Sequence, residues 1–200
     1  MAVSLSVCLF ATNSIPSPGG TGRCKYTGQS VRALPIRVFT VGKKRSPAVQ
    51  LLVDEYTSKL RHYCAIEDVQ VRCNPRNARE KQAQIVDEDM AVMNLIRPDD
   101  WVVLLDEQGI DIESEEMAEL IGGAADKGAS KLSFCIGGPY GHGPKSRERA
   151  NISIKLSSLV LNHQIALVVL MEQLYRLFAR TTIAKSCFHM LLDLRTNLLY

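Results

Sequence analysis

The 200-residue sequence lacks an apolar run long enough for a membrane helix, and its cysteines lack the spacing of metal ligands. The longest apolar stretch, residues 165–171, is far short of the roughly 20 residues that span a bilayer. The six cysteines include no Cys-x-x-Cys pair and no His/Cys group at metal spacing. We therefore expect no membrane span, no metal site and no disulfide framework, and interpret the cysteines as isolated thiols in a reducing compartment.

Acidic residues are also absent from the beginning of the chain, because no Asp or Glu precedes Asp54. Residues 1–34 hold three basic residues, five serines and three threonines. This composition predicts an organelle transit peptide, and the scarcity of arginine favours the chloroplast over the mitochondrion. A plain disordered extension is the alternative interpretation. The net charge of +3 is too small to indicate a nucleic-acid or membrane partner by itself.

Strand and helix signals alternate from residue 36 onward. Ser46-Pro47 is a typical helix start, and the apolar residues 101–105 are typical of an interior parallel strand. The alternation predicts an α/β fold with a parallel sheet flanked by helices. We expect strands at residues 36–41, 66–71, 101–105 and 132–136, with a last strand and exposed loop at 152–161. We expect helices at residues 46–62, 78–95, 114–122 and 164–178, and a short one opening at Pro144.

The glycine-rich segment after residues 132–136 is the first candidate binding site, because glycine lets a backbone approach a ligand closely. Gly138 to Gly143 followed by Pro144-Lys145-Ser146 nearly matches a phosphate-binding loop, but the extra proline shifts the lysine and removes a backbone donor. The sequence also lacks a G-x-G-x-x-G motif after its first strand and a G-x-S-x-G motif. These absences argue against a serine hydrolase and leave an unrelated α/β nucleotide-binding enzyme as a weak alternative.

Five short segments carry a more specific signal through their order and spacing. They are Val41-Gly42-Lys43, Leu104-Leu105-Asp106-Glu107-Gln108-Gly109, Phe134-Cys135-Ile136-Gly137-Gly138-Pro139-Tyr140-Gly141, Leu156-Ser157-Ser158-Leu159-Val160-Leu161-Asn162-His163-Gln164 and Glu172-Gln173-Leu174-Tyr175-Arg176. Together they resemble the knotted SPOUT methyltransferases, specifically the RlmH-type enzymes that methylate N3 of a pseudouridine in large-subunit ribosomal RNA. The resemblance implies a SPOUT methyltransferase domain at residues 35–178.

The resemblance also implies a C-terminal trefoil knot, a homodimer, and S-adenosylmethionine bound in a pocket made by three loops. Carried over to this chain, the cofactor-binding residues are Leu105, Gly137, Leu156, Ser157, Ser158, Leu159, Val160 and Leu161. All three loops follow apolar strands, and open α/β sheets bind ligands at the carboxyl ends of their strands. Methyl transfer of this kind requires no metal.

Binding to RNA requires basic residues that contact its phosphates. Lys43, Lys44 and Arg45 in the first turn, and Arg176 in the last helix, are candidates for contact with RNA phosphates. A solvated surface is the alternative for the first turn, and an ion pair at the dimer interface is the alternative for Arg176. The sequence identifies no residue that accepts the proton of the pseudouridine.

Two departures from the family pattern support a second hypothesis. Residues 179–200 form a divergent tail, and Leu167 stands where bacterial members often have arginine. The alternative function is therefore a catalytically impaired knotted protein that binds the ribosome or assists its assembly.

Overall fold

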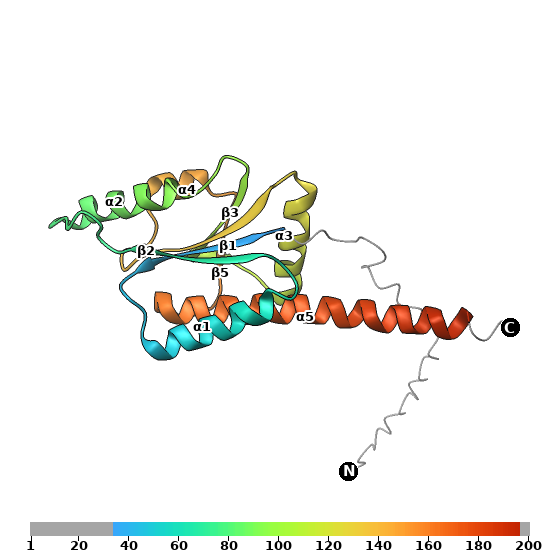
Figure 1. Ribbon diagram of the computed structural model, residues 1–200. Helices are drawn as coiled ribbons and strands as arrows, with labels where there is room; N and C mark the ends of the chain where they lie inside the picture. Colours follow the sequence, from blue (N-terminus) through green and yellow to red (C-terminus); the bar gives the residue numbers. More distant parts are fainter. Residues whose placement is uncertain (1–33, 197–200) are drawn as a thin grey trace, which may run out of the picture. The chain divides into compact units, whose positions relative to one another are not determined.

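The computed structural model describes residues 34–196, and a five-stranded sheet lies at its centre (Figure 1). Apart from Leu34, the predicted transit peptide lies outside the described residues. The strands are β1 (Ile36–Gly42), β2 (Ile66–Arg72), β3 (Asp100–Asp111), β4 (Lys131–Ile136) and β5 (Ile152–Lys155). Their order is β2-β1-β4-β3-β5 and every neighbouring pair is parallel, which confirms the predicted α/β architecture.

Helices cover both faces of the sheet. They are α1 (Pro47–Leu60), α2 (Lys81–Met93), α3 (Ser114–Asp126), α4 (Pro144–Arg149) and α5 (His163–Thr196). Figure 1 shows α1 and α5 side by side on one face, and α2 with α4 on the other. This arrangement explains why the central strands are apolar throughout, since both of their faces are buried.

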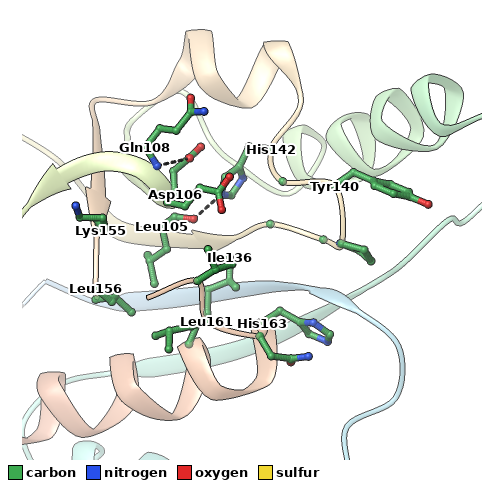
Figure 2. A pocket seen from close by; sticks show the side chains of 18 of the residues that line it. Leu105, Asp106, Gln108, Ile136, Tyr140, His142, Lys155, Leu156, Leu161 and His163 are labelled. Carbon is green, nitrogen blue, oxygen red and sulfur yellow. Dashed lines mark hydrogen bonds between the residues drawn. The ribbon is translucent and has the colours of Figure 1, made fainter. Parts of the chain in front are cut away.

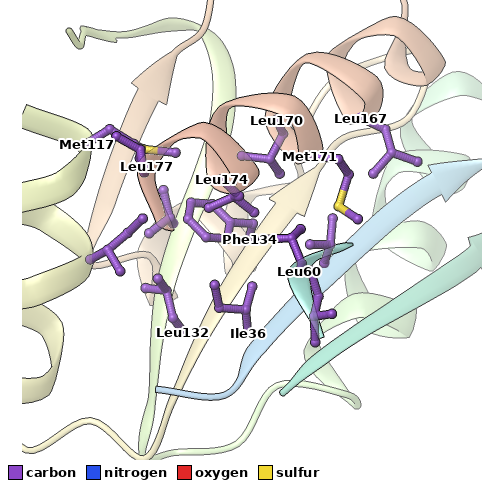
Figure 3. Packing of buried hydrophobic residues seen from close by; sticks show 14 of the residues in the cluster. Ile36, Leu60, Met117, Leu132, Phe134, Leu167, Leu170, Met171, Leu174 and Leu177 are labelled. Atoms are coloured by element: carbon purple, nitrogen blue, oxygen red, sulfur yellow. The ribbon is translucent and has the colours of Figure 1, made fainter. Parts of the chain in front are cut away.

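Two apolar clusters fill the space between the sheet and its helices. Alternate residues of a strand point to opposite faces, so Ile36 and Val38 belong to one cluster, while Phe39 and Val41 belong to the other. The larger cluster joins the sheet to α1, α3 and α5, and Figure 3 shows its α5 side chains above Phe134. Fully burying each such side chain contributes roughly 1.5–3 kcal/mol, so this cluster anchors α5 against the sheet.

The beginning of α1 follows from its sequence, whereas that of α2 is three residues later than predicted. Ser46 caps α1, and its hydroxyl accepts a hydrogen bond from the Val49 amide at 3.4 Å. Before α2, the Asn74 side chain accepts a hydrogen bond from the Ala78 amide at 2.7 Å, and Asn74 and Asn77 both have positive φ. These asparagines hold a turn where helix was expected, because their side chains compete for backbone groups.

The third strand and the last helix are also longer than predicted. β3 continues beyond Leu105 to Asp111, with a register shift against β5 between Leu105 and Ile110. The segment expected to be a loop after residue 105 is therefore an irregularity within the strand, of the kind that often lies beside binding sites. α5 begins at His163 and continues to Thr196, past residue 178.

The described residues also bear on the membrane and thiol predictions. No helix among them combines the length and apolarity that crossing a membrane requires. Cys64, Cys73 and Cys135 are free thiols. Burial raises the pKa of Cys64 to about 11 and that of Cys135 to about 12, so both thiols stay protonated at neutral pH.

Candidate functional site

A pocket of about 620 Å³ lies at the carboxyl ends of β3, β4 and β5 (Figure 2). Its apolar walls include Leu105, Ile136, Leu156 and Leu161. Among the residues predicted to bind the cofactor, all but Ser158 line this pocket, although they come from three separate parts of the chain. The pocket has the size of sites for small organic ligands, and its lining combines apolar side chains with polar and charged ones.

Gly137 follows β4 directly and presents bare backbone to the pocket. A Cβ atom at this position would lie 2.9 Å from the carbonyl carbon of Gly141, which is too close. The turn beyond it is closed by a hydrogen bond from the Gly141 amide to the Gly138 carbonyl at 3.0 Å, and Gly141 has a φ of +81°. Glycine is therefore required at Gly137 for close packing and at Gly141 for conformation.

A charged cluster borders the pocket next to Leu105. Arg147 of α4 forms an ion pair with the nearly buried Asp106 at 2.6 Å. The Nε2 atom of His142 lies 2.9 Å from the Leu105 carbonyl oxygen. Burial lowers the pKa of His142 below its ordinary range, although the Leu105 carbonyl and the Asp106 carboxylate act in the opposite direction. The imidazole is therefore neutral at neutral pH.

His163 borders the pocket from the beginning of α5. Its ring packs against Gly42, where a Cβ atom would lie 2.6 Å from the Nε2 atom of His163. This Nε2 atom is buried and has no hydrogen-bond partner among residues 34–196. Burial, and secondarily the charge of Arg45, lowers the pKa of His163, so a second neutral imidazole borders the pocket.

Two buried carboxylates of α2 support the elements next to the pocket, Asp89 the start of α4 and Glu88 the glycine turn. Asp89 accepts hydrogen bonds from the Lys145 amide at 2.8 Å, the Ser146 amide at 2.9 Å and the Ser146 hydroxyl. Gly143 at the N-cap has no side chain to cap the helix, so Asp89 does so from another helix. Glu88 lies under Gly138, where a Cβ atom would be 2.5 Å from its Oε2 atom.

The residues predicted to contact RNA have different environments. Lys43 and Lys44 are exposed beyond the end of β1. Arg45 is buried, and its guanidinium pairs with Asp68 through both terminal nitrogens. This placement fits a structural role for Arg45 better than contact with phosphate. Arg176 is exposed on α5 and pairs with Glu172 one turn away. None of these four residues lines the pocket, and contact between them and RNA stays a prediction.

Sequence reasoning missed several residues at the pocket. His142 contacts the Leu105 carbonyl from 37 residues away, and Lys81 enters the lining from α2. No local motif marks Lys81, and although His142 lies within the glycine-rich segment, nothing in that segment indicates its contact with the Leu105 carbonyl. Within the described residues, no group of His, Cys, Asp and Glu is arranged to hold a metal ion.

Comparison with known proteins identifies relatives over most of the chain. The family model described as "Predicted SPOUT methyltransferase" matches residues 34–189. A protein of Arabidopsis thaliana named "Putative RNA methyltransferase" is 67% identical over 162 residues, which cover 80% of this chain and 84% of the relative. "Ribosomal RNA large subunit methyltransferase H" of Clostridium novyi (strain NT) is 34% identical over 147 residues, which cover 72% of this chain and 92% of the relative.

Solved structures include more distant similarities. One is titled a "probable methylase family protein" and comes from Haemophilus influenzae Rd KW20. It is 14% identical, with a TM-score of 0.47, and the match covers 82% of this chain and 72% of that structure.

Proposed function

Because this chain belongs to the SPOUT methyltransferase family, we propose that it uses S-adenosylmethionine to methylate N3 of a pseudouridine in large-subunit ribosomal RNA. The observation that carries the proposal is the pocket at the ends of β3, β4 and β5. The predicted cofactor residues other than Ser158 line it, on a chain similar to proteins named as ribosomal RNA methyltransferases.

The pocket suits S-adenosylmethionine in size and lining. Leu105, Ile136, Leu156 and Leu161 provide apolar walls for an adenine ring, and the bare backbone at Gly137 permits close approach. The cofactor supplies a methyl group activated by a positively charged sulfur. The two histidines of the pocket are neutral, and the charges of Arg147 and Lys155 are offset by their ion pairs with Asp106 and Asp111.

The protein's own contribution is to position the RNA base and to hold the proton that N3 gives up. A neutral imidazole can accept a proton. The structure singles out neither histidine for this role, because the Nε2 atom of His142 contacts the Leu105 carbonyl and that of His163 is buried against Gly42.

We also propose that the chain is knotted at the pocket loops, acts as a homodimer and works in an organelle, with the chloroplast favoured over the mitochondrion. The family resemblance supports the knot and the dimer. The composition of residues 1–34 supports the organelle. Exposed apolar side chains also lie on the adjacent helices α1 and α5, with Leu51 71% and Ile165 49% exposed, and these provide a surface for a second copy.

Transfer of labelled methyl from S-adenosylmethionine to large ribosomal subunits that lack the modification tests the function. Label on one mapped pseudouridine would support the proposal. A folded dimer that binds cofactor and ribosomes without transferring methyl would favour the catalytically impaired alternative. Leu167 bears on that alternative, because it is fully buried in the core and provides no charge at a position where bacterial members often have arginine.

A further inference from the structure

Tyr140 is an exposed aromatic side chain on the rim of the pocket. It is 45% exposed and follows the glycines at the end of β4. Figure 2 shows its ring directed away from Leu105 and Leu156. The ammonium of Lys81, the first residue of α2, lies 4.9 Å from the ring centroid, and both residues line the pocket. The rim therefore presents an aromatic ring paired with a cation, which the methyl-transfer site described above does not use.

The backbone that carries Tyr140 is held in place from several sides. The turn closes between Gly138 and Gly141, Asp89 fixes the start of α4 beyond it, and Glu88 lies beneath it. A tyrosine on such a turn offers a large contact surface with few rotatable bonds. Binding a flat partner therefore requires little additional ordering.

Positive charge is concentrated in the segment that leads to Lys81. Residues 72–81 contain four basic residues and one acidic residue, a net charge of +3 that equals the formal charge of the whole chain. The register places Arg72 beside Gly42, so the exposed Lys43 and Lys44 continue from the neighbouring strand. The Asn74 side chain fixes the turn by bonding to both backbone groups of Ala78. Arg76 pairs with Asp87 at 3.4 Å, and the other basic residues of this surface are complementary to a phosphate backbone.

We propose that Tyr140 and Lys81 form a nucleotide subsite in which Tyr140 stacks on an unpaired RNA base and Lys81 contacts a neighbouring phosphate. Lys81 lies over one face of the ring, and the tyrosine is 45% exposed, so a base can approach it from solvent. Single-stranded RNA is commonly bound by bases stacked on aromatic side chains above a basic surface. The subsite rests on the proposed function, because it holds a nucleotide next to the one that enters the pocket.

Binding of a single-stranded oligouridylate to the full chain, measured by fluorescence anisotropy, tests the stacking. Tyr140→Ala is expected to weaken binding roughly 5- to 150-fold, whereas Tyr140→Phe keeps most of the affinity because it keeps the ring. An abasic oligonucleotide of equal length should bind the unmodified chain and Tyr140→Ala equally. The proposal is overturned if Tyr140→Ala binds oligouridylate as tightly as the unmodified chain does, or if it loses as much affinity for the abasic strand as for oligouridylate. It is also overturned if the unmodified chain does not bind oligouridylate.

Lys81→Gln tests the phosphate contact, and Lys127→Gln is its matched control. Lys127 also lies over an aromatic ring, that of Trp101, at 4.5 Å, but neither residue lines the pocket. Lys81→Gln should reduce the slope of log affinity against log salt concentration by about 0.7, and the control should not. Equal slopes for the two variants would contradict the phosphate contact.

Cofactor affinity and thermal stability of each variant separate this subsite from a structural role of Tyr140. In Tyr140→Ala the thermal stability should stay unchanged and the cofactor affinity should fall by much less than the RNA affinity, and a parallel loss of RNA affinity, cofactor affinity and stability would overturn the proposal. Methyl transfer by the unmodified chain is measured separately. If transfer fails while the oligonucleotide results hold, the proposed function is refuted and the RNA subsite is not.

Discussion

Asp89 is the buried carboxylate on which the start of α4 depends, and replacing it with alanine tests that dependence. The carboxylate accepts hydrogen bonds from the Lys145 and Ser146 amides at 2.8 and 2.9 Å and from the Ser146 hydroxyl. An N-cap contributes roughly 0.5–2 kcal/mol, and a hydrogen bond to a charged group contributes about 1.5–3 kcal/mol. Because these contacts act as one unit, we expect Asp89→Ala to lower the free energy of unfolding by about 2–4 kcal/mol.

The same substitution should weaken cofactor binding. α4 carries Arg147, whose ion pair with Asp106 borders the pocket, and the glycine turn leads directly into α4. Loosening that helix should reduce the affinity for S-adenosylmethionine about tenfold, which corresponds to about 1.4 kcal/mol of binding free energy. Urea denaturation measures the stability, and isothermal titration calorimetry measures the affinity at a temperature where each variant is folded.

Asp100→Ala is the matched control, because Asp100 is equally buried but lies at the amino end of β3. It accepts hydrogen bonds from the Arg97 amide and the Ser133 hydroxyl, both at 3.1 Å. This control should lose stability and keep its cofactor affinity. Gly143→Ala tests the same contact from the other side, since its Cβ atom would overlap the Asp89 carboxyl group. The reasoning is refuted if Asp89→Ala costs less than about 0.5 kcal/mol, or if its effect adds fully to that of Gly143→Ala.

Three further predictions concern the pocket and the core. Gly137→Arg should abolish cofactor binding by filling the pocket and displacing Gly141, and unchanged affinity in calorimetry would contradict the site. Burial lowers the pKa of His142, so the unfolded chain binds more protons below about pH 6.5 and this histidine reduces stability as the pH falls. The stability difference between the unmodified chain and His142→Gln should therefore change on acidification, and a constant difference would be contrary evidence. The pKa of Cys64 is raised to about 11 and that of Cys135 to about 12, so stability should fall as the pH rises above about 8.5 and both thiols should resist a thiol reagent until the chain unfolds. Rapid labelling of both in the native protein would contradict this account.

The parts of the fold that sequence predicted well are those with local causes. Ser46-Pro47 determines the start of α1 through contacts within one turn, and the apolar run at residues 101–105 indicates a strand buried on both faces. The sequence did not predict the late start of α2, because the Asn74 side chain forms a hydrogen bond with Ala78 and holds a turn where helix was expected. A periodicity pattern does not distinguish the helix from this turn, since the same short polar segment is compatible with both.

The site was predictable only where a motif or a strand end marked it. Arg45 was expected to contact RNA because it follows two exposed lysines, but its partner Asp68 lies on β2, 23 residues away. That pairing becomes visible only when β1 and β2 are placed side by side. Removing the partner of a buried arginine that is hydrogen-bonded through two nitrogens strongly destabilises the protein. Exchange of Asp68 for an RNA phosphate is therefore unfavourable.

The contacts that support the pocket are nonlocal for a common physical reason. A loop that binds a ligand through bare backbone has few side chains with which to hold itself, so its support must come from elsewhere in the fold. Here α2 supplies it, with Asp89 bonded to Ser146 across 57 residues and Glu88 beneath Gly138. The glycine motif therefore locates the candidate site, whereas the residues that keep the loop in position are determined by the packing of α2 and α4 on the opposite face from α5.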